Sequence, residues 1–152
     1  MTIRPAGPAD VSAVFQLVTG ILQAEFPQDQ AAYPTEDLQR LTETYRGPEN
    51  VFLVAEEDGH LVGTCGVKSE NKKTAILRRL FVDASHRDQG VGFGLLQEAL
   101  NFCRKQGFRE VVIRTSTQME RAIRLCCSLG FQEDGRWTLD NITLVRFRLK
   151  IT

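Results

Sequence analysis

The stretch that most limits the fold of this chain is residues 87–94, Arg-Asp-Gln-Gly-Val-Gly-Phe-Gly. It lies between a strand-like segment, 77–82, and a helix-like segment, 95–105. Glycine in a helix costs roughly 0.5–1 kcal/mol relative to alanine, so a run of alternating glycines at a helix start needs another reason. The first N–H groups of a helix lack internal partners and carry the positive end of its dipole. The stretch therefore predicts a cradle for an anion, most often a phosphate.

The spacing of the glycines excludes two common phosphate loops. In the dinucleotide motif G-x-G-x-x-G, the third glycine would fall on Leu95 counting from Gly90, or on Gln97 counting from Gly92. A P-loop needs a Gly-Lys-Ser/Thr sequence, which does not follow here. The pattern that remains is Arg-x-x-Gly-x-Gly after a strand that ends in Leu-Phe-Val-Asp. A glycine-rich turn without a ligand is the structural alternative.

Length and charge narrow the class of protein. The 152 residues fit one domain, expected to span 1–152. The net charge is zero, which argues against a nucleic-acid binder that depends on bulk attraction to phosphates. We find no membrane-spanning apolar run and no signal-peptide pattern, and the four cysteines do not form a metal-binding set. These features predict a cytoplasmic enzyme or binding module without a metal or a membrane partner.

The periodicity of apolar residues predicts a mixed α/β fold. A short strand at 2–6 precedes a helix that ends near Phe26, and a second, shorter helix carries Leu38, Leu41 and Tyr45. Three strands follow, at 51–55, 60–68 and 75–82, joined by hairpins. The predicted order is βααβββαβαββ, with helices on both faces of the sheet. The helix after the glycines should connect two neighbouring parallel strands.

This order, together with two local motifs, resembles the GNAT superfamily of acetyl-CoA-dependent N-acetyltransferases. The Arg87-x-x-Gly90-x-Gly92 sequence is similar to the acyl-CoA signature of that family. The segment 122–131, Ala-Ile-Arg-Leu-Cys-Cys-Ser-Leu-Gly-Phe, is similar to its second motif, a helix that ends in Leu-Gly-Phe. The resemblance covers nearly the whole chain. It implies the transfer of an acetyl group from acetyl-CoA to a primary amine, by direct attack in a ternary complex, and it leaves a homodimer open.

The resemblance also implies which residues hold the cofactor. Backbone amides of the glycine stretch would bind the pyrophosphate, and the end of the preceding strand would offer backbone groups to the pantetheine arm, with an amide near Val82 polarising the thioester carbonyl. Arg87, and less so Arg79, would add positive charge, although either side chain could equally be a surface residue. The cofactor-binding residues expected on this basis are Leu80, Phe81, Val82, Arg87, Asp88, Gln89, Gly90, Val91, Gly92, Phe93 and Gly94.

The sequence departs from the family where proton transfer is concerned. A tyrosine that many relatives place in the second motif is replaced by Cys126, an asparagine by Met119, and a glutamate on the strand before the glycines by Ile76. Cys126 could share a proton with the leaving thiolate, because a thiol pKa near 8.5 lies closer to that of CoA than a phenol does. It could equally be a small core residue. The candidate general bases are carboxylates of the first two helices and their connection, namely Glu25, Asp29, Glu36 and Asp37. A bound water that works through backbone carbonyls is the other option.

Two functions from different classes remain at this point. One is the N-acetyltransferase, and the other is a catalytically silent module that binds acyl-CoA and regulates a partner. A domain for an unrelated nucleotide is a weaker third hypothesis. In the family, the acceptor is selected by the connection at 26–35 and the one at 137–143. Asp29 and Asp140 lie there, so a cationic amine is a plausible acceptor.

Overall fold

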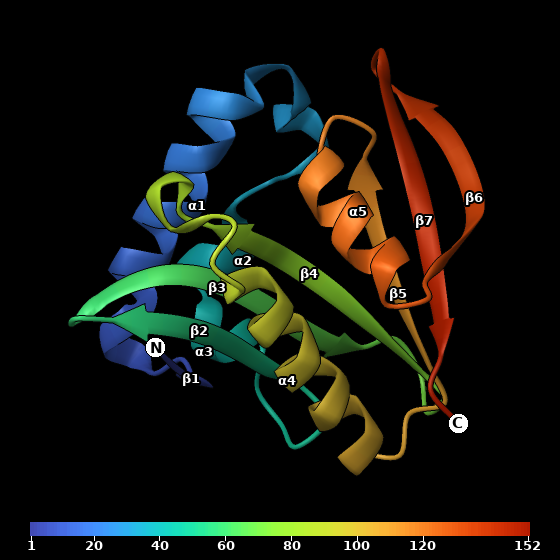
Figure 1. Ribbon diagram of the computed structural model, residues 1–152, viewed down its shortest axis with the longest axis horizontal. Helices are drawn as coiled ribbons and strands as arrows, with labels where there is room; N and C mark the ends of the chain where they lie inside the picture. Colours follow the sequence, from blue (N-terminus) through green and yellow to red (C-terminus); the bar gives the residue numbers. More distant parts are fainter.

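The chain folds around a seven-stranded mixed sheet with strand order β1-β2-β3-β4-β5-β7-β6 (Figure 1). The computed structural model describes the backbone of residues 1–152 and all side chains except those of residues 30–32. Most neighbouring strands are antiparallel, whereas β4 and β5 are parallel and are connected through a helix. The strands are β1 (Thr2–Pro5), β2 (Val51–Glu57), β3 (His60–Ser69), β4 (Thr74–Val82), β5 (Glu110–Ser116), β6 (Gln132–Leu139) and β7 (Ile142–Lys150).

Helices cover both faces of the sheet, as predicted (Figure 1). On one face, α1 (Val11–Glu25), α2 (Glu36–Gln39) and α3 (Leu41–Thr44) share a core that includes Val14, Val18 and Leu38. On the other face, α4 (Val91–Lys105) shares a second core with the sheet, and α5 (Glu120–Ser128) adds Cys126 to it. Three 3₁₀ segments complete the fold: η1 (Pro8–Asp10), η2 (Pro27–Ala32) and η3 (Ala84–His86). The observed order confirms the predicted βααβββαβαββ arrangement.

Some predicted boundaries differ from the structure. The second helix is divided into α2 and α3, because Arg40 leaves the helical region with φ −116° and ψ 43°. Helix α4 begins at Val91 rather than at residue 95, since the glycines that were expected to precede it form its first turn. The 26–35 connection contains η2, and β6 continues to Leu139. None of these differences changes the topology.

The parallel pair β4–β5 is joined along only part of its length. Thr74 to Leu77 pair with Glu110 to Ile113, and beyond Leu77 the two strands separate. On the other side, β4 remains paired with β3 up to Val82. The second half of β4 therefore has one edge that is free of strand partners within the described sheet.

A β-bulge at Arg79 and Leu80 changes the direction of the side chains in this open half. Thr64 pairs with Phe81 and Gly66 with Arg78, so two residues of β4 lie opposite one residue of β3. Arg79 has φ +58°, an unusual value for a residue other than glycine, and its carbonyl accepts a 2.7 Å hydrogen bond from Thr64 Oγ1. Because of the extra residue, Leu80 packs on the α4 side and Phe81 on the α1 side of the sheet.

Candidate functional site

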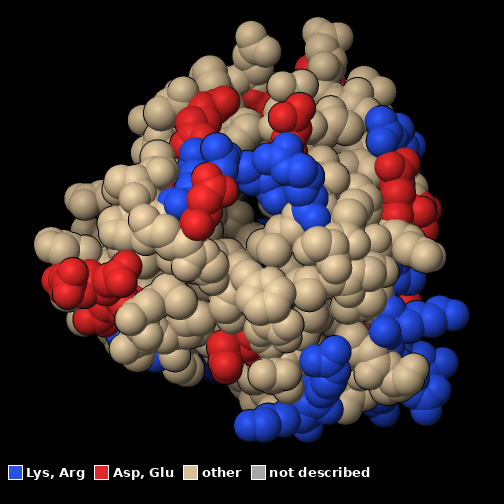
Figure 2. All heavy atoms as spheres, viewed as in Figure 1, with Lys and Arg blue, Asp and Glu red and all other residues tan. Residues whose placement is uncertain are grey.

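A cavity of about 680 Å³ opens where β4 separates from β5. The end of β4, the first turn of α4, the start of α5 and the end of α1 form its walls. Figure 2 shows basic and acidic side chains gathered around a hollow on this face of the molecule. The cavity is lined by Ile21, Glu25, Phe26, Leu80, Phe81, Val82, His86, Arg87, Asp88, Gly90, Val91, Gly92, Phe93, Gln118, Met119, Glu120, Arg121, Ala122, Arg124 and Leu125.

The helix start in this wall has the geometry of an anion cradle. Asp88 and Gly90 both have positive φ, +62° and +84°, and Gly90 is the N-cap of α4. Gly94 N donates to Gly90 O at 2.9 Å, so the amides of residues 91–93 precede the first helical hydrogen bond. These N–H groups, with the positive end of the helix dipole, can bind a phosphate.

Two glycines of the cradle are required for different reasons. A Cβ at Gly90 would meet no atom within 4 Å, so glycine is needed there for its left-handed backbone. A Cβ at Gly92 would lie 3.2 Å from Leu125 Cδ2 and 3.5 Å from Val82 Cγ2. Gly92 therefore allows α4 to approach α5 and the end of β4, which keeps the cradle next to the open strand edge.

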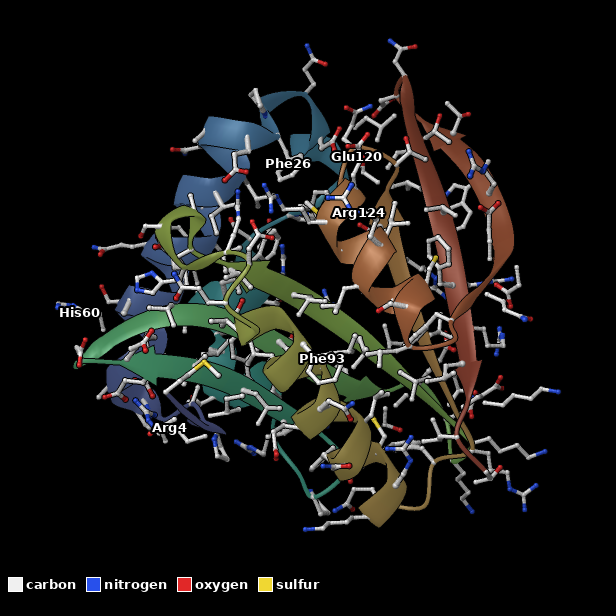
Figure 3. All side chains as sticks on the ribbon, viewed as in Figure 1. Arg4, Phe26, His60, Phe93, Glu120 and Arg124 are labelled. Carbon is white, nitrogen blue, oxygen red and sulfur yellow. The ribbon has the colours of Figure 1, made fainter. Side chains whose placement is uncertain are left out.

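Most of the residues predicted to bind the cofactor line this cavity. Gln89 and Gly94 do not. Gly94 faces the N-terminal residues, where an added Cβ would lie 3.0 Å from Ile3 Cδ1. Phe93 is 47% exposed at the cavity wall, which is unusual for a large apolar side chain (Figure 3). The predicted residues that the structure brings together are Leu80, Phe81, Val82, Arg87, Asp88, Gly90, Val91, Gly92 and Phe93.

Arg87 is engaged by a carboxylate of α1. Its Nη1 and Nη2 atoms donate to Glu25 Oε1 and Oε2 at 2.6 and 2.7 Å, and its Nε donates to Val82 O at 3.2 Å. The Glu25 carboxylate raises the pKa of the Arg87 guanidinium. The pair joins α1 to the end of β4. Both carboxylate oxygens of Glu25, one of the predicted general-base candidates, are engaged in it.

Sequence reasoning missed two arginines of α5. Arg121 and Arg124 both line the cavity, and Figure 3 shows Arg124 on α5 with Glu120 and Phe26 beyond its upper end. Arg121 is 3.5 Å from Asp88 in an exposed pair, so that contact contributes little binding energy. The i, i+3 spacing on a helix places both arginines on one face and was the signal available in the sequence.

Cys126 lies in the core of the protein and does not line the cavity. The residue is 1% exposed, and burial raises the pKa of its thiol to about 12. This position favours the packing role that the sequence left open for Cys126 over a role in proton transfer. Met119 lines the cavity but offers no polar contact, and Ile76 lies in the paired half of β4, opposite Val112.

The remaining base candidates are in different environments. Asp37 accepts hydrogen bonds from Arg79 Nε at 3.1 Å and from Tyr45 Oη at 3.2 Å. It is therefore part of a buried ion pair on the α1 side of the sheet. Arg79 accordingly points toward α2 and does not line the 680 Å³ cavity. Glu36 is exposed. Asp29 is buried, with 3% of its surface exposed.

Tyr33 contacts the end of β5 beyond the residues that pair with β4. Its hydroxyl accepts a 2.7 Å hydrogen bond from Ser116 N at the end of β5 and lies 3.2 Å from Thr115 Oγ1. Burial raises the pKa of this phenol, so Tyr33 remains protonated. Arg79 Nη2 donates to the carbonyl of Pro34, the next residue. The connection before α2 is thus attached to both strands at the point where they separate.

Comparisons with known proteins place this architecture in an enzyme class. The family model of the acetyltransferase (GNAT) family matches residues 16–131. N-acetyltransferase 8 of Rattus norvegicus is 36% identical over 113 residues, which are 70% of this chain and 51% of that protein. An acetyltransferase from Streptococcus agalactiae has a TM-score of 0.86 at 19% identity and covers 99% of this chain and 98% of its own. A putative acetyltransferase from Salmonella typhimurium, solved with its cofactor acetyl-CoA, has a TM-score of 0.80 at 24% identity, covering 99% of this chain and 93% of that one.

The chain belongs to the GNAT acetyltransferase family. This finding confirms the family and the fold that the sequence motifs indicated. The chain spans about half the length of N-acetyltransferase 8 of Rattus norvegicus. Across the described residues, none of the helices is both long and apolar enough to traverse a bilayer.

Proposed function

We propose that this chain is an acetyl-CoA-dependent N-acetyltransferase that acts on a primary amine. The observation that carries the proposal is the cavity that joins the α4 helix start to the open edge of β4. The α4 helix start suits a pyrophosphate, and the open edge of β4 suits an extended, amide-containing arm. Family membership and the acetyl-CoA complex of the Salmonella typhimurium relative support the same ligand.

The end of β4 supplies the polar groups that the reaction needs. Asp83 N donates to Val62 O on β3 at 2.8 Å, so the alternation of a strand turns the backbone groups of Val82 away from β3. Val82 O accordingly accepts from Arg87 Nε. The Val82 N–H in this orientation would donate to the thioester carbonyl and stabilise the oxyanion that develops on it.

The reaction proceeds by direct attack in this scheme. The nitrogen of a neutral amine bonds to the thioester carbon, the C–S bond breaks, and the thiolate of CoA leaves. The proton of the attacking amine passes to water in the cavity. The protein contributes by holding both reactants at the open strand edge, which lowers the entropic cost of their encounter.

Arg121 and Arg124 would strengthen cofactor binding by contacting its phosphate groups. Their side chains line the cavity next to the cradle, and guanidinium groups bind phosphates through paired hydrogen bonds. We expect Arg121→Ala combined with Arg124→Ala to raise the Kd for CoA by roughly tenfold or more. Arg104→Ala, an exposed arginine at the far end of α4, is the matched control and should leave the Kd unchanged.

The test combines binding with turnover. CoA should raise the melting temperature at saturating concentration, and release of free thiol from acetyl-CoA should depend on an added amine. Binding of CoA without turnover on a broad amine panel would instead support the silent acyl-CoA-binding module. The buried position of Cys126, where many relatives carry tyrosine, is the observation that favours this second function. Absence of CoA binding would refute both.

A further inference from the structure

Arg87 belongs to the glycine stretch, but all three nitrogen atoms of its guanidinium group are bound by other parts of the protein. Two of them donate to the two carboxylate oxygens of Glu25 at 2.6 and 2.7 Å. The third, Nε, donates to Val82 O at 3.2 Å. The side chain thus connects the end of α1 to the last residue of β4, at the wall of the 680 Å³ cavity.

Glu25 is the carboxylate that holds Arg87, although two others lie close to it. The hydrogen bonds to Glu25 raise the pKa of the guanidinium most, and the charges of Asp83 and Asp88 add to this effect. The carboxylate of Asp83 is engaged by His86 Nδ1 at 2.9 Å, and the Asp88 side chain is 85% exposed. Neither forms a hydrogen bond with Arg87 in the described structure, so the contact with Glu25 is selective.

The peptide group between Val82 and Asp83 is held at both of its ends. On one side, Asp83 N donates to Val62 O of β3 at 2.8 Å, and on the other side Val82 O accepts from Arg87 Nε. In an extended strand the N–H and C=O groups of one residue point to the same edge. The contact with Arg87 therefore also sets the direction of the Val82 N–H, toward the open edge of β4.

We propose that Glu25 and Arg87 form a positioning pair for the Val82 amide that stabilises the oxyanion. This inference rests on the proposed function. Glu25 orients the guanidinium, the guanidinium orients Val82 O, and the Val82 N–H stays directed at the thioester carbonyl. Neither side chain touches the reacting atoms. In this scheme Arg87 is not a phosphate ligand, and Glu25 is not the general base.

The geometry suits positioning better than either of those two roles. A general base needs a free lone pair directed at the amine, whereas both oxygens of Glu25 already accept hydrogen bonds from Arg87. A guanidinium paired with a carboxylate in this two-bond arrangement has its charge balanced, which weakens its attraction for a phosphate. The paired bonds also fix the plane of the guanidinium, and a fixed plane is what the alignment of a backbone carbonyl requires.

A double-mutant cycle tests the pair. Thiol release from acetyl-CoA is measured for wild type, Glu25→Gln, Arg87→Gln and the double variant. The acceptor is the most reactive of 1,4-diaminobutane, phenylethylamine, glycinamide and a peptide with N-terminal alanine. We expect each single variant to lower kcat roughly tenfold, because the oxyanion donor is displaced. The double variant should lose the same factor and no more, because either substitution breaks the same chain of contacts.

Binding and stability should change little in these variants. The Kd for CoA, measured by calorimetric titration, should stay within about twofold, because the interaction affects the transition state alone. The side chains of the pair are 18% and 32% exposed, so the melting temperature should stay within about 4 °C. Glu98→Gln and Arg104→Gln, both exposed on α4 and outside the cavity lining, are the matched controls and should keep wild-type kcat.

Two further measurements separate positioning from the other roles. Arg87→Lys keeps the charge but loses the forked geometry, so its kcat should fall as far as that of Arg87→Gln. Wild-type kcat in Arg87→Lys would show that charge alone matters and would overturn the inference. The dependence of kcat on pH should keep its shape in Glu25→Gln. Loss of its acid limb would identify Glu25 as the general base and would also overturn the inference.

The remaining outcomes distinguish the inference from the proposed function. Multiplicative losses of kcat in the double variant would overturn the inference, and so would a tenfold rise in the Kd for CoA at unchanged kcat in Arg87→Gln. A fall in melting temperature well beyond 4 °C would assign the pair to stability instead. All three results leave the N-acetyltransferase intact. A wild-type protein without turnover on any of these amines would refute the proposed function, and the inference would fail with it.

Discussion

The two halves of β4 belong to one continuous strand, but they differ in the strands with which they pair. From Ala75 to Leu77 the strand is paired on both edges, with β3 on one side and β5 on the other. From Arg78 to Val82 it is paired with β3 alone. The first half connects the two parts of the sheet, and the second half lines the cavity. One end of this strand therefore stabilises the sheet, and the other end forms part of the cavity wall.

The open half is held by side chains in place of a neighbouring strand. Arg79 binds Asp37 and the carbonyl of Pro34, and the Tyr33 hydroxyl receives an amide of β5 that β4 does not reach. These contacts attach residues 33 and 34 to both strands beyond their paired half. The Tyr33 hydroxyl thus accepts an amide at the unpaired end of β5, whereas Arg79 ties β4 to α2 through its side chain.

Removing the buried pair at the open half should have the largest effect on stability. The side chains of Arg79 and Asp37 are only 4% and 10% exposed, so Asp37→Asn leaves a buried guanidinium without its counter-charge. We expect a loss of about 3–5 kcal/mol in the free energy of unfolding, measured by urea denaturation. Glu36→Gln changes the exposed neighbouring carboxylate and should cost less than about 0.5 kcal/mol. Similar small losses for both variants would show that the strand separation does not depend on this pair.

A leucine-to-alanine substitution should mainly lower stability in the paired half of β4 and mainly weaken CoA binding in the open half. Leu77 is 1% exposed in the paired half, and Leu77→Ala should cost about 2–5 kcal/mol of stability while leaving the Kd for CoA unchanged. Leu80 is only partly buried and lines the cavity, so Leu80→Ala should cost about 1 kcal/mol and weaken CoA binding several-fold. Calorimetric titration at a temperature where both variants are folded checks the binding. A binding loss in Leu77→Ala as large as in Leu80→Ala would contradict the division.

The smallest of these effects should be the loss of stability at acid pH where β4 and β5 are paired. Glu110 begins β5; it accepts a 3.0 Å hydrogen bond from Thr74 Oγ1 and pairs with Arg148, and the Arg148 contact lowers the pKa of Glu110. Since the folded-state pKa is lowered, this stabilisation is present above the unfolded value, near 4.3, and is lost as the pH falls through the folded-state value.

Glu110→Gln should therefore lower stability by about 0.5–1 kcal/mol near pH 7 and by less at pH 3. Melting temperatures of both proteins between pH 3 and pH 7 test this, with equal protein concentration and salt. Curves that stay a constant distance apart across this range would mean that the charge of Glu110 does not stabilise the β4–β5 junction.

The order of the elements, the covering of both sheet faces and the local motifs were predictable from sequence, whereas the side-chain contacts between distant elements were not. The glycine pattern predicted the cradle, because the backbone of Gly90 and the close packing at Gly92 depend on residues nearby in the chain. The bulge at Arg79 carries no such signal, since its positive φ is imposed by the hydrogen bond to Thr64 and the pair with Asp37. The environment of Asp29 likewise depends on how η2 packs against distant strands.

The attachment of residues 33 and 34 has a consequence for how substrate range can diverge among related enzymes. Tyr33 and Pro34 fix the connection to β5 and β4, whereas Gln28 lies before these attachments and lines a separate cavity of about 500 Å³ beside the β6–β7 turn. Under the proposed function, mutations at Gln28, or at Asn141 in that turn, would change the lining of this cavity without disturbing the strand gap. Divergence at these positions would then leave the open edge of β4 unchanged.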